Sequence, residues 1–151
     1  GILYTLAQTL GATKIALGHH RDDFIETLLL NQFYSGRTRS MGVKLTGDNQ
    51  SAEIIRPMVF IAESDLIDYA TQNSFPIIPC NLCGSQDGLK RQQIKELLVS
   101  LEQQNPSVRG NLLSALGHID LTHLLVGAST ALPDIKVASE KTVPSELIQL
   151  A

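Results

Sequence analysis

The stretch Lys14–Phe33 reads Lys-Ile-Ala-Leu-Gly-His-His-Arg-Asp-Asp-Phe-Ile-Glu-Thr-Leu-Leu-Leu-Asn-Gln-Phe, and it decides the fold. Its short apolar run, Ile15–Leu17, is typical of a strand that is buried on both faces of a sheet. Gly18 ends this run, and the polar residues His19–Asp23 follow it. The stretch therefore predicts a strand, a polar turn and a helix.

The predicted helix, Phe24–Tyr34, follows a capping signal. Asp23 and Glu26 have the N-cap to N3 spacing of a capping box. The helix then places large apolar side chains on one face, namely Phe24, Ile25, Leu28, Leu29 and Phe33. This face is expected to pack against the core.

The polar turn is a candidate site. In open α/β sheets, ligands bind at the carboxyl ends of the strands, where His19–Asp23 would lie. Two imidazoles, a guanidinium and two adjacent carboxylates could bind a polar ligand there. A simpler interpretation is also open, in which Asp23 only caps the helix and the His-His-Arg segment is solvated.

The bulk composition indicates one domain with an aliphatic core, since 43% of the 151 residues are hydrophobic and 5% are aromatic. No apolar run is long enough to span a membrane, and no signal peptide opens the sequence. We therefore expect a soluble, cytoplasmic protein. The net charge of −3 argues against a generally basic RNA-binding surface. Two local clusters could still contact RNA or simply be solvated: Arg37, Arg39 and Lys44 in one loop, and Lys90, Arg91 and Lys95 in one helix.

The remaining patterns predict further elements along the chain. These are a helix end at Gly1–Leu10 closed by Gly11, a polar loop at 35–52, a strand at Glu53–Arg56, helices at Glu63–Asn73, Leu89–Gln104 and Val108–Leu116, and a loosely ordered tail at 127–151. The expected inward residues are Leu66, Ile67, Tyr69 and Ala70 in the first of these three helices, and Ile94, Leu97, Leu98 and Leu101 in the second. Strands that alternate with helices indicate a parallel α/β sheet. About three strands are too few to cover such a sheet, so we expect a fragment of a longer domain.

Cys80 and Cys83 are the only cysteines, and they form a Cys-x-x-Cys motif. The motif could be a redox dithiol, half of a zinc site, or part of an iron–sulfur cluster. Two cysteines that merely pack in a core are a fourth interpretation. The residues alone leave these alternatives open.

Three segments together resemble the tRNA 2-thiocytidine synthetases, a family of PP-loop ATP pyrophosphatases. They are Leu17–Asp23, the loop that ends at Met41, and Phe75–Gln86, which reads Phe-Pro-Ile-Ile-Pro-Cys-Asn-Leu-Cys-Gly-Ser-Gln. The last segment is highly specific, whereas the Gly-His-x-x-Asp-Asp element is shared by many PP-loop RNA-modifying enzymes. The resemblance runs from Gly1 to about His123. It implies a truncated parallel-sheet PP-loop ATPase fold, like the adenine nucleotide alpha hydrolases, at 1–126 with C-terminal helices.

The resemblance also implies a reaction, the ATP-dependent 2-thiolation of a cytidine in the tRNA anticodon loop. In that family ATP adenylates the C2 oxygen, and sulfur carried on a [4Fe-4S] cluster then displaces AMP. Three cysteines hold the cluster, two from an upstream Cys-x-x-Cys and one that Cys83 matches. The role of Cys80 stays open.

The same resemblance assigns roles to the polar turn. Gly18 and His19 would line the nucleotide side of the crevice. Asp22 and Asp23 would lie near the reacting phosphates, where carboxylates could hold Mg²⁺ or orient the reacting base. The implied partners are tRNA and a sulfur donor such as a cysteine desulfurase, with a homodimer as one assembly that the sequence leaves open.

The sequence also departs from the family pattern. The motif Ser-Gly-Gly-x-Asp-Ser is absent, because Arg37 follows the only Ser-Gly, and the upstream Cys-x-x-Cys is absent too. That glycine-rich loop cradles the phosphates with its backbone N–H groups. We expect both motifs to precede Gly1 in a longer parent, and the isolated chain to be inactive. The alternatives are a non-catalytic remnant that binds RNA or a partner subunit, and a PP-loop enzyme that modifies another tRNA base.

Overall fold

The computed structural model describes residues 2–46, 52–77 and 86–124, with no account of the side chains of residues 86 and 87. The chain divides into two compact units, Gly1–Gly117 and His118–Ala151. The first unit contains α1 (Ile2–Thr9), β1 (Lys14–Ala16), α2 (Arg21–Ser35), β2 (Lys44–Leu45), β3 (Glu53–Ile55), α3 (Glu63–Gln72), α4 (Gln86–Gln104) and α5 (Val108–Ala115). The described part of the second unit contains a 3-10 helix, η1 (Leu121–His123), whose first turn is capped by the Asp120 carboxylate.

The sheet is mixed, with the strand order β1-β3-β2. β1 pairs in parallel with β3, so that Lys14 lies opposite Glu53 and Ala16 opposite Ile55. This confirms the predicted α/β class and the parallel pairing of the first two expected strands. β2 runs antiparallel to β3 and lies inside the segment that the sequence predicted as a polar loop. Both of its residues are exposed, so no alternation of apolar and polar residues marked it.

The burial expected for β1 is wrong. Lys14 and Ala16 are exposed, and Ile15 is only half-buried. Within the described residues, β3 is the only strand that pairs with β1, which leaves β1 at an edge of the sheet.

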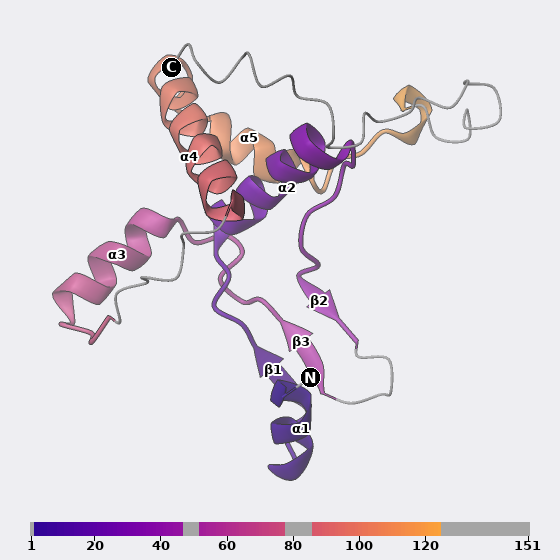
Figure 1. Cartoon of the computed structure of the whole chain (residues 1–151), viewed down its shortest axis with the longest axis vertical. Coiled ribbons are helices and arrows are strands. Elements are labelled where there is room, and N and C mark those ends of the chain that lie inside the picture. Colours follow the sequence, from indigo (N-terminus) through magenta and orange to yellow (C-terminus); the bar gives the residue numbers. More distant parts are fainter. Residues whose placement is uncertain (1, 47–51, 78–85, 125–151) are drawn as a thin grey trace. The chain divides into compact units, whose positions relative to one another are not determined.

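The apolar core of the first unit lies between helices. Ile25 and Leu29 of α2 pack against Ile94 and Leu98 of α4, and α5 adds Leu112 and Leu113 at the margin. Figure 1 shows α4 and α5 beside α2. The predicted apolar face of α2 is confirmed for its first four members, all of them buried, but Phe33 is 58% exposed. Gly36 ends α2 in the left-handed conformation, with φ 59°.

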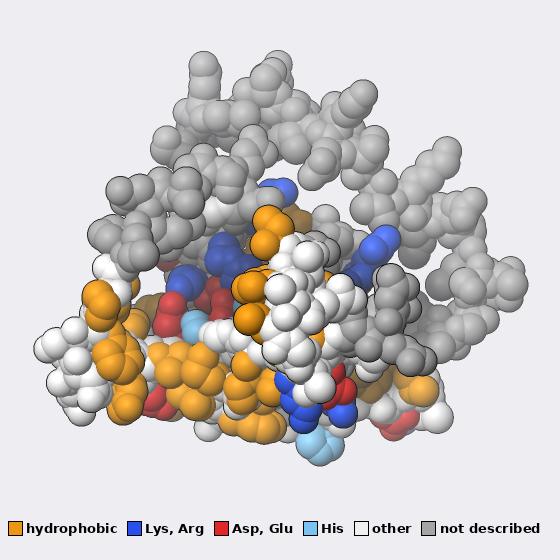
Figure 2. Space-filling view, turned by 90° about the horizontal axis from the view of Figure 1, so that it is seen from below, with side chains coloured by type: hydrophobic (Ala, Val, Ile, Leu, Met, Phe, Trp, Pro, Cys, Tyr) orange, Lys and Arg blue, Asp and Glu red, His pale blue; other side chains and the backbone are white. Residues whose placement is uncertain are grey.

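The remaining helices match their predicted positions better than their predicted burial. α1, α3 and α5 end within one or two residues of the expected limits, and α4 begins three residues earlier than expected. In α3, Ile67 and Tyr69 are more than half exposed, which corrects the inward face expected for that helix. In α4, Ile94 and Leu98 are buried as predicted, whereas Leu97 and Leu101 are not. Figure 2 shows hydrophobic side chains open to solvent over much of the face that it draws.

Several sequence predictions fall outside the described residues. These concern Cys80, Cys83 and the tail at 127–151, together with the domain limit placed at residue 126. Among the helices that the structure describes, none combines the length and apolar character needed to cross a membrane.

The helical core can be tested with two neighbouring leucines of α4. Leu98 is fully buried, so Leu98→Ala should lower the free energy of unfolding by about 2–5 kcal/mol. Leu97 is 38% exposed, so Leu97→Ala should cost clearly less, and it serves as the matched control. Urea unfolding followed by circular dichroism measures both. Equal losses would mean that α4 does not pack through the face that carries Leu98.

Candidate functional site

The polar turn joins β1 to α2 as the sequence predicted, but the helix begins earlier. The N–H of Leu17 donates to the carbonyl of Ile55 and extends the pairing of β1 with β3. α2 starts at Arg21, whose N–H donates to the carbonyl of Ile61. The turn therefore lies directly beyond the carboxyl ends of β1 and β3.

The predicted cap of α2 is wrong by one turn. His20 is the N-cap residue, and Asp23 occupies N3. The Asp23 carboxylate accepts the backbone N–H of His20 at 3.0 Å, which is the N3 half of a capping box. Glu26, expected at N3, is instead a buried residue further along the helix. His20–Asp23 and Asp23–Glu26 have the same spacing, so the sequence pattern fitted both.

The two histidines of the turn have different surroundings. His19 is half-buried, and its Nδ1 accepts a hydrogen bond from Nε of Arg56 at 3.3 Å. The Nε2 of His20 lies 3.4 Å from an oxygen of Asp23. The buried Nδ1 of His20 has no hydrogen-bond partner in the described part of the chain. Gly18, which precedes both, is exposed.

Asp22 is the most heavily engaged residue of the turn, and it is only 3% exposed. One carboxylate oxygen accepts the backbone N–H of Glu63, the first residue of α3, at 2.8 Å. The other lies 2.6 Å from Nη1 of Arg109 in α5 and 3.5 Å from Nη2 of Arg21. Asp22 thus joins the starts of α2 and α3 to α5.

The charge of Asp22 is stabilised against its burial. Burial alone would raise the pKa of this carboxyl group, but the Glu63 N–H and the guanidinium groups of Arg21 and Arg109 outweigh it. The pKa therefore falls below its ordinary value of 3.8. Arg109 is held in turn by Glu102 of α4 at 2.9 Å. Burial opposes the charge of Arg109, but Glu102 and Asp22 overcome this effect and raise its pKa.

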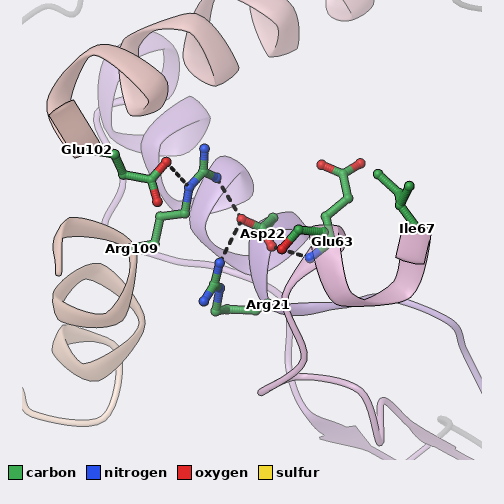
Figure 3. A pocket seen from close by; sticks show the side chains of 7 residues that line it. Arg21, Asp22, Glu63, Ile67, Glu102 and Arg109 are labelled. Carbon is green, nitrogen blue, oxygen red and sulfur yellow. Dashed lines mark hydrogen bonds and ion pairs between the residues drawn. The ribbon is translucent and has the colours of Figure 1, made fainter. Parts of the chain in front are cut away.

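A hollow of about 270 Å³ opens beside this junction. Figure 3 shows the Arg109 guanidinium between Glu102 and Asp22, while Glu63 and Ile67 of α3 lie on the other side of Asp22. No sequence motif pointed to Arg109, because its partner Asp22 lies 87 residues away in the chain.

A second charged network links α2, α3 and α4. Nη1 of Arg91 lies 2.7 Å from a carboxylate oxygen of Glu26 and 3.7 Å from one of Asp23. Lys95 lies 2.9 Å from Glu63 and 3.7 Å from Glu26. Arg91 and Lys95, two members of the basic cluster predicted on α4, therefore neutralise acidic groups within the protein. The third, Lys90, lies 5.0 Å from the ring centre of Tyr34.

Glu26 and Lys95 respond differently to this network. Burial raises the pKa of Glu26 although Arg91 and Lys95 act against it, and one of its oxygens has no hydrogen-bond partner among the described residues. Burial would lower the pKa of Lys95, but Glu63 and Glu26 raise it. The pKa of Glu26 is raised on folding. Its contribution to stability is therefore fully present below pH 4.5 and is lost as the pH rises through the pKa of the folded state.

The other basic cluster is more open. Arg37 and Arg39 are exposed, and Lys44 pairs with Glu53 at 3.0 Å. Within the described residues, His, Cys, Asp and Glu side chains do not gather in threes as a metal site would require.

The two aspartates of the turn can be separated by measuring stability. Asp22→Asn removes a buried charge that faces Arg109, and should lower the free energy of unfolding at pH 7 by about 3–5 kcal/mol. Asp23→Asn keeps an acceptor for the His20 N–H, and should cost less than about 1 kcal/mol. Because the pKa of Asp22 is depressed in the folded state, the deficit of Asp22→Asn should be complete above pH 3.8 and shrink as the pH falls further.

Unfolding by urea between pH 3 and 7 measures the two variants side by side. Equal effects of both substitutions would contradict the structural role of Asp22, as would a deficit of Asp22→Asn that is no smaller at pH 3 than at pH 7.

Several tRNA-cytidine(32) 2-sulfurtransferases are identical to this chain at about half of the aligned residues. The tRNA-cytidine(32) 2-sulfurtransferase of Anaeromyxobacter sp. (strain Fw109-5) is 52% identical over 125 residues, which cover 83% of this chain and 41% of that protein. The enzyme of the same name from Coxiella burnetii (strain Dugway 5J108-111) is 50% identical over 125 residues, or 83% of this chain and 49% of that protein. The enzyme of the same name from Polynucleobacter necessarius is 46% identical over 140 residues, which cover 93% of this chain and 46% of that protein. The chain thus spans less than half the length of these relatives.

A solved structure has a similar fold. The U34-tRNA thiolase NcsA from Methanococcus maripaludis, determined with its [4Fe-4S] cluster, aligns with a TM-score of 0.58 at 17% identity. The alignment covers 79% of this chain and 41% of that one. At this identity the likeness concerns the fold.

These comparisons confirm the resemblance seen in the sequence. The PP-loop domain model matches residues 1–84, which include the polar turn and both cysteines. With more than half of its length matched, and with 2-sulfurtransferases as relatives, the chain belongs to the PP-loop domain family.

Proposed function

We propose that this chain forms part of an ATP-dependent tRNA 2-thiolation enzyme that acts on a cytidine of the anticodon loop. The observation that carries the proposal is the 52% identity over 125 residues to a tRNA-cytidine(32) 2-sulfurtransferase. The U34-tRNA thiolase with the similar fold supports the reaction class at a coarser level.

The geometry of the polar turn supports distinct roles for its residues. Gly18 and His19 lie at the strand ends, on the side proposed for the nucleotide. Asp22 does not fit a Mg²⁺ ligand, since two guanidinium groups and an N–H already surround its carboxylate. The Asp23 side chain is 26% exposed, and it is the carboxylate that we assign to Mg²⁺ or to orienting the reacting base.

The bound groups would supply the chemistry that the chain lacks. ATP would convert the C2 oxygen of the cytidine into a leaving group, and a [4Fe-4S] cluster would carry the sulfur. Cys83 would give the cluster one thiolate, an assignment that rests on the sequence because residues 78–85 lie outside the described ranges.

The partners follow from the same proposal. The tRNA would contact the exposed Arg37 and Arg39, since positive side chains fix the backbone of a loop whose bases are splayed into a pocket. A sulfur donor such as a cysteine desulfurase, a homodimeric assembly and a cytoplasmic location complete the proposal.

The activity can be tested in a hybrid protein. In the hybrid, this chain replaces the matched 125-residue segment of the Anaeromyxobacter relative. Expressed in a bacterium that lacks 2-thiocytidine, it should restore this nucleoside, measured by mass spectrometry of digested tRNA. Asp23→Asn should lower the yield by about 100-fold or more, the usual loss for a group that stabilises a transition state.

Asp68→Asn is the matched control, because Asp68 is exposed on α3 and should leave the yield unchanged. A hybrid that folds and binds tRNA without forming 2-thiocytidine would favour a non-catalytic RNA-binding role. A different thiolated nucleoside would point to another tRNA base.

The two cysteines can be distinguished in the same hybrid. Cys83→Ala should lose the iron of the anaerobically reconstituted protein together with thiolation, because too few thiolates then remain to hold a cluster. Cys80→Ala should retain its iron. Iron content and the visible absorption of the cluster measure both variants, and the reverse pattern would exchange the two assignments.

A further inference from the structure

Arg56 is a buried cation that the proposed reaction has not yet used. It directly follows β3, and only 9% of the residue is exposed. Its backbone N–H donates to the carbonyl of Val43, so β3 and the loop before β2 hold it from the main chain. The guanidinium thus lies at the carboxyl end of β3, next to the turn that follows β1.

The hydrogen bonds of this guanidinium go to neutral acceptors. Nε donates to Nδ1 of His19 at 3.3 Å, and Nη1 donates to the carbonyl oxygen of Gly42. Among the described residues, no carboxylate lies within ion-pair distance of Arg56. The three other arginines in the two networks, Arg21, Arg91 and Arg109, each face at least one acid.

A buried guanidinium without an anion is costly. Arginine is rarely buried unless its charge is paired, because transfer of a charge out of water is compensated only by an opposite charge and full hydrogen bonding. The sheet places this uncompensated charge at the strand ends, where open α/β folds bind their ligands. The imbalance is therefore relieved most simply by an anion on the ligand.

The contact with Arg56 also fixes the proton of His19. Because Nε of Arg56 is a donor, Nδ1 of His19 must accept through its lone pair, and the ring proton lies on Nε2. His19 is then a hydrogen-bond donor through Nε2. No hydrogen bond from that atom occurs within the described residues.

We propose that Arg56 and His19 form an anion-binding pair for a phosphate group, with the guanidinium supplying charge and Nε2–H of His19 a further donor. A guanidinium beside a second N–H donor suits phosphate oxygens, which accept charge-assisted hydrogen bonds. This inference rests on the proposed function in one respect, the source of the phosphate, which is the nucleotide or the RNA backbone.

The pair can be observed directly by nitrogen-15 NMR of the 151-residue chain. The free protein should show a protonated Nε2 and an unprotonated Nδ1 for His19. Titration with inorganic phosphate should shift the Arg56 Nε–H and His19 Nε2–H resonances. AMP and a short anticodon stem-loop RNA are the two further probes. Tighter binding of AMP would assign the phosphate to the nucleotide, and tighter binding of the RNA would assign it to the tRNA backbone.

Substitutions provide the second measurement. Arg56→Met should weaken phosphate binding by about tenfold or more, the effect of losing one charge-assisted hydrogen bond. Lys14→Met is the matched control, because Lys14 is an exposed cation at the amino end of β1, and it should change the affinity less than about twofold. Arg56→Lys keeps the charge but loses the fixed Nε donor. It should retain part of the phosphate affinity, and the ring proton of His19 should no longer be confined to Nε2.

Two results would overturn the inference. One is a His19 ring protonated at Nδ1 in the free protein. The other is a phosphate titration that leaves the Arg56 and His19 resonances in place. Neither depends on whether Arg56→Met folds, because both are measured on the unaltered chain. They also do not depend on thiolation, so a failure here is distinguishable from a failure of the proposed enzymatic activity.

Discussion

The carboxylate of Asp22 lies where three helices meet, and the arrangement of the polar turn depends on it. Its oxygens accept from the first N–H of α3 and from a guanidinium of α5, while its own backbone forms the first turn of α2. Only 3% of Asp22 is exposed, so water has little access to replace these partners. Removing the carboxylate would therefore leave both the Arg109 guanidinium and the first N–H of α3 without their partner. Because these groups are shielded from water, this loss is costly, and the junction favours this one arrangement of the three helices.

The charged junctions complement a small apolar core. Ile25, Leu29, Ile94 and Leu98 supply the buried aliphatic contact between α2 and α4. Ion pairs also link the helices: Arg91 and Lys95 of α4 pair with Glu26 of α2, and Arg109 of α5 pairs with Asp22 of α2. The apolar contact brings the helices together without direction, whereas the paired charges determine which residues of each helix face the turn.

Local patterns in the sequence predicted the elements well and their surroundings less well. The strand, turn and helix at 14–35 followed from an apolar run, a glycine and a helical period. The N-cap of α2 was ambiguous, because Asp23 stands three residues from both His20 and Glu26. Contacts that are distant in sequence accompany the observed cap at His20: Arg21 donates to Ile61, and Glu26 pairs with Arg91.

Burial and partners needed information that no short window contains. Periodicity placed Phe33, Ile67 and Leu97 on apolar faces, but it could not tell whether this chain supplies a surface to cover them. The same limit applied to the site. The sequence singled out the adjacent aspartates, but the surroundings of Asp22 are set by groups 41 and 87 residues away.

The first residue of α3 carries an unusual share of the attachment of that helix. Ala62 provides no side-chain cap, no residue of α3 is buried, and Glu63 makes the contacts with both Asp22 and Lys95. A helix held at one end by polar contacts can open without disturbing the apolar core. The amide hydrogens of α3 should therefore exchange with solvent through local opening, while those in the middle of α2 wait for global unfolding. We therefore expect α3 to unfold and refold as a separate segment, so that the wall it forms beside Asp22 is lost and restored while the rest of the protein stays folded.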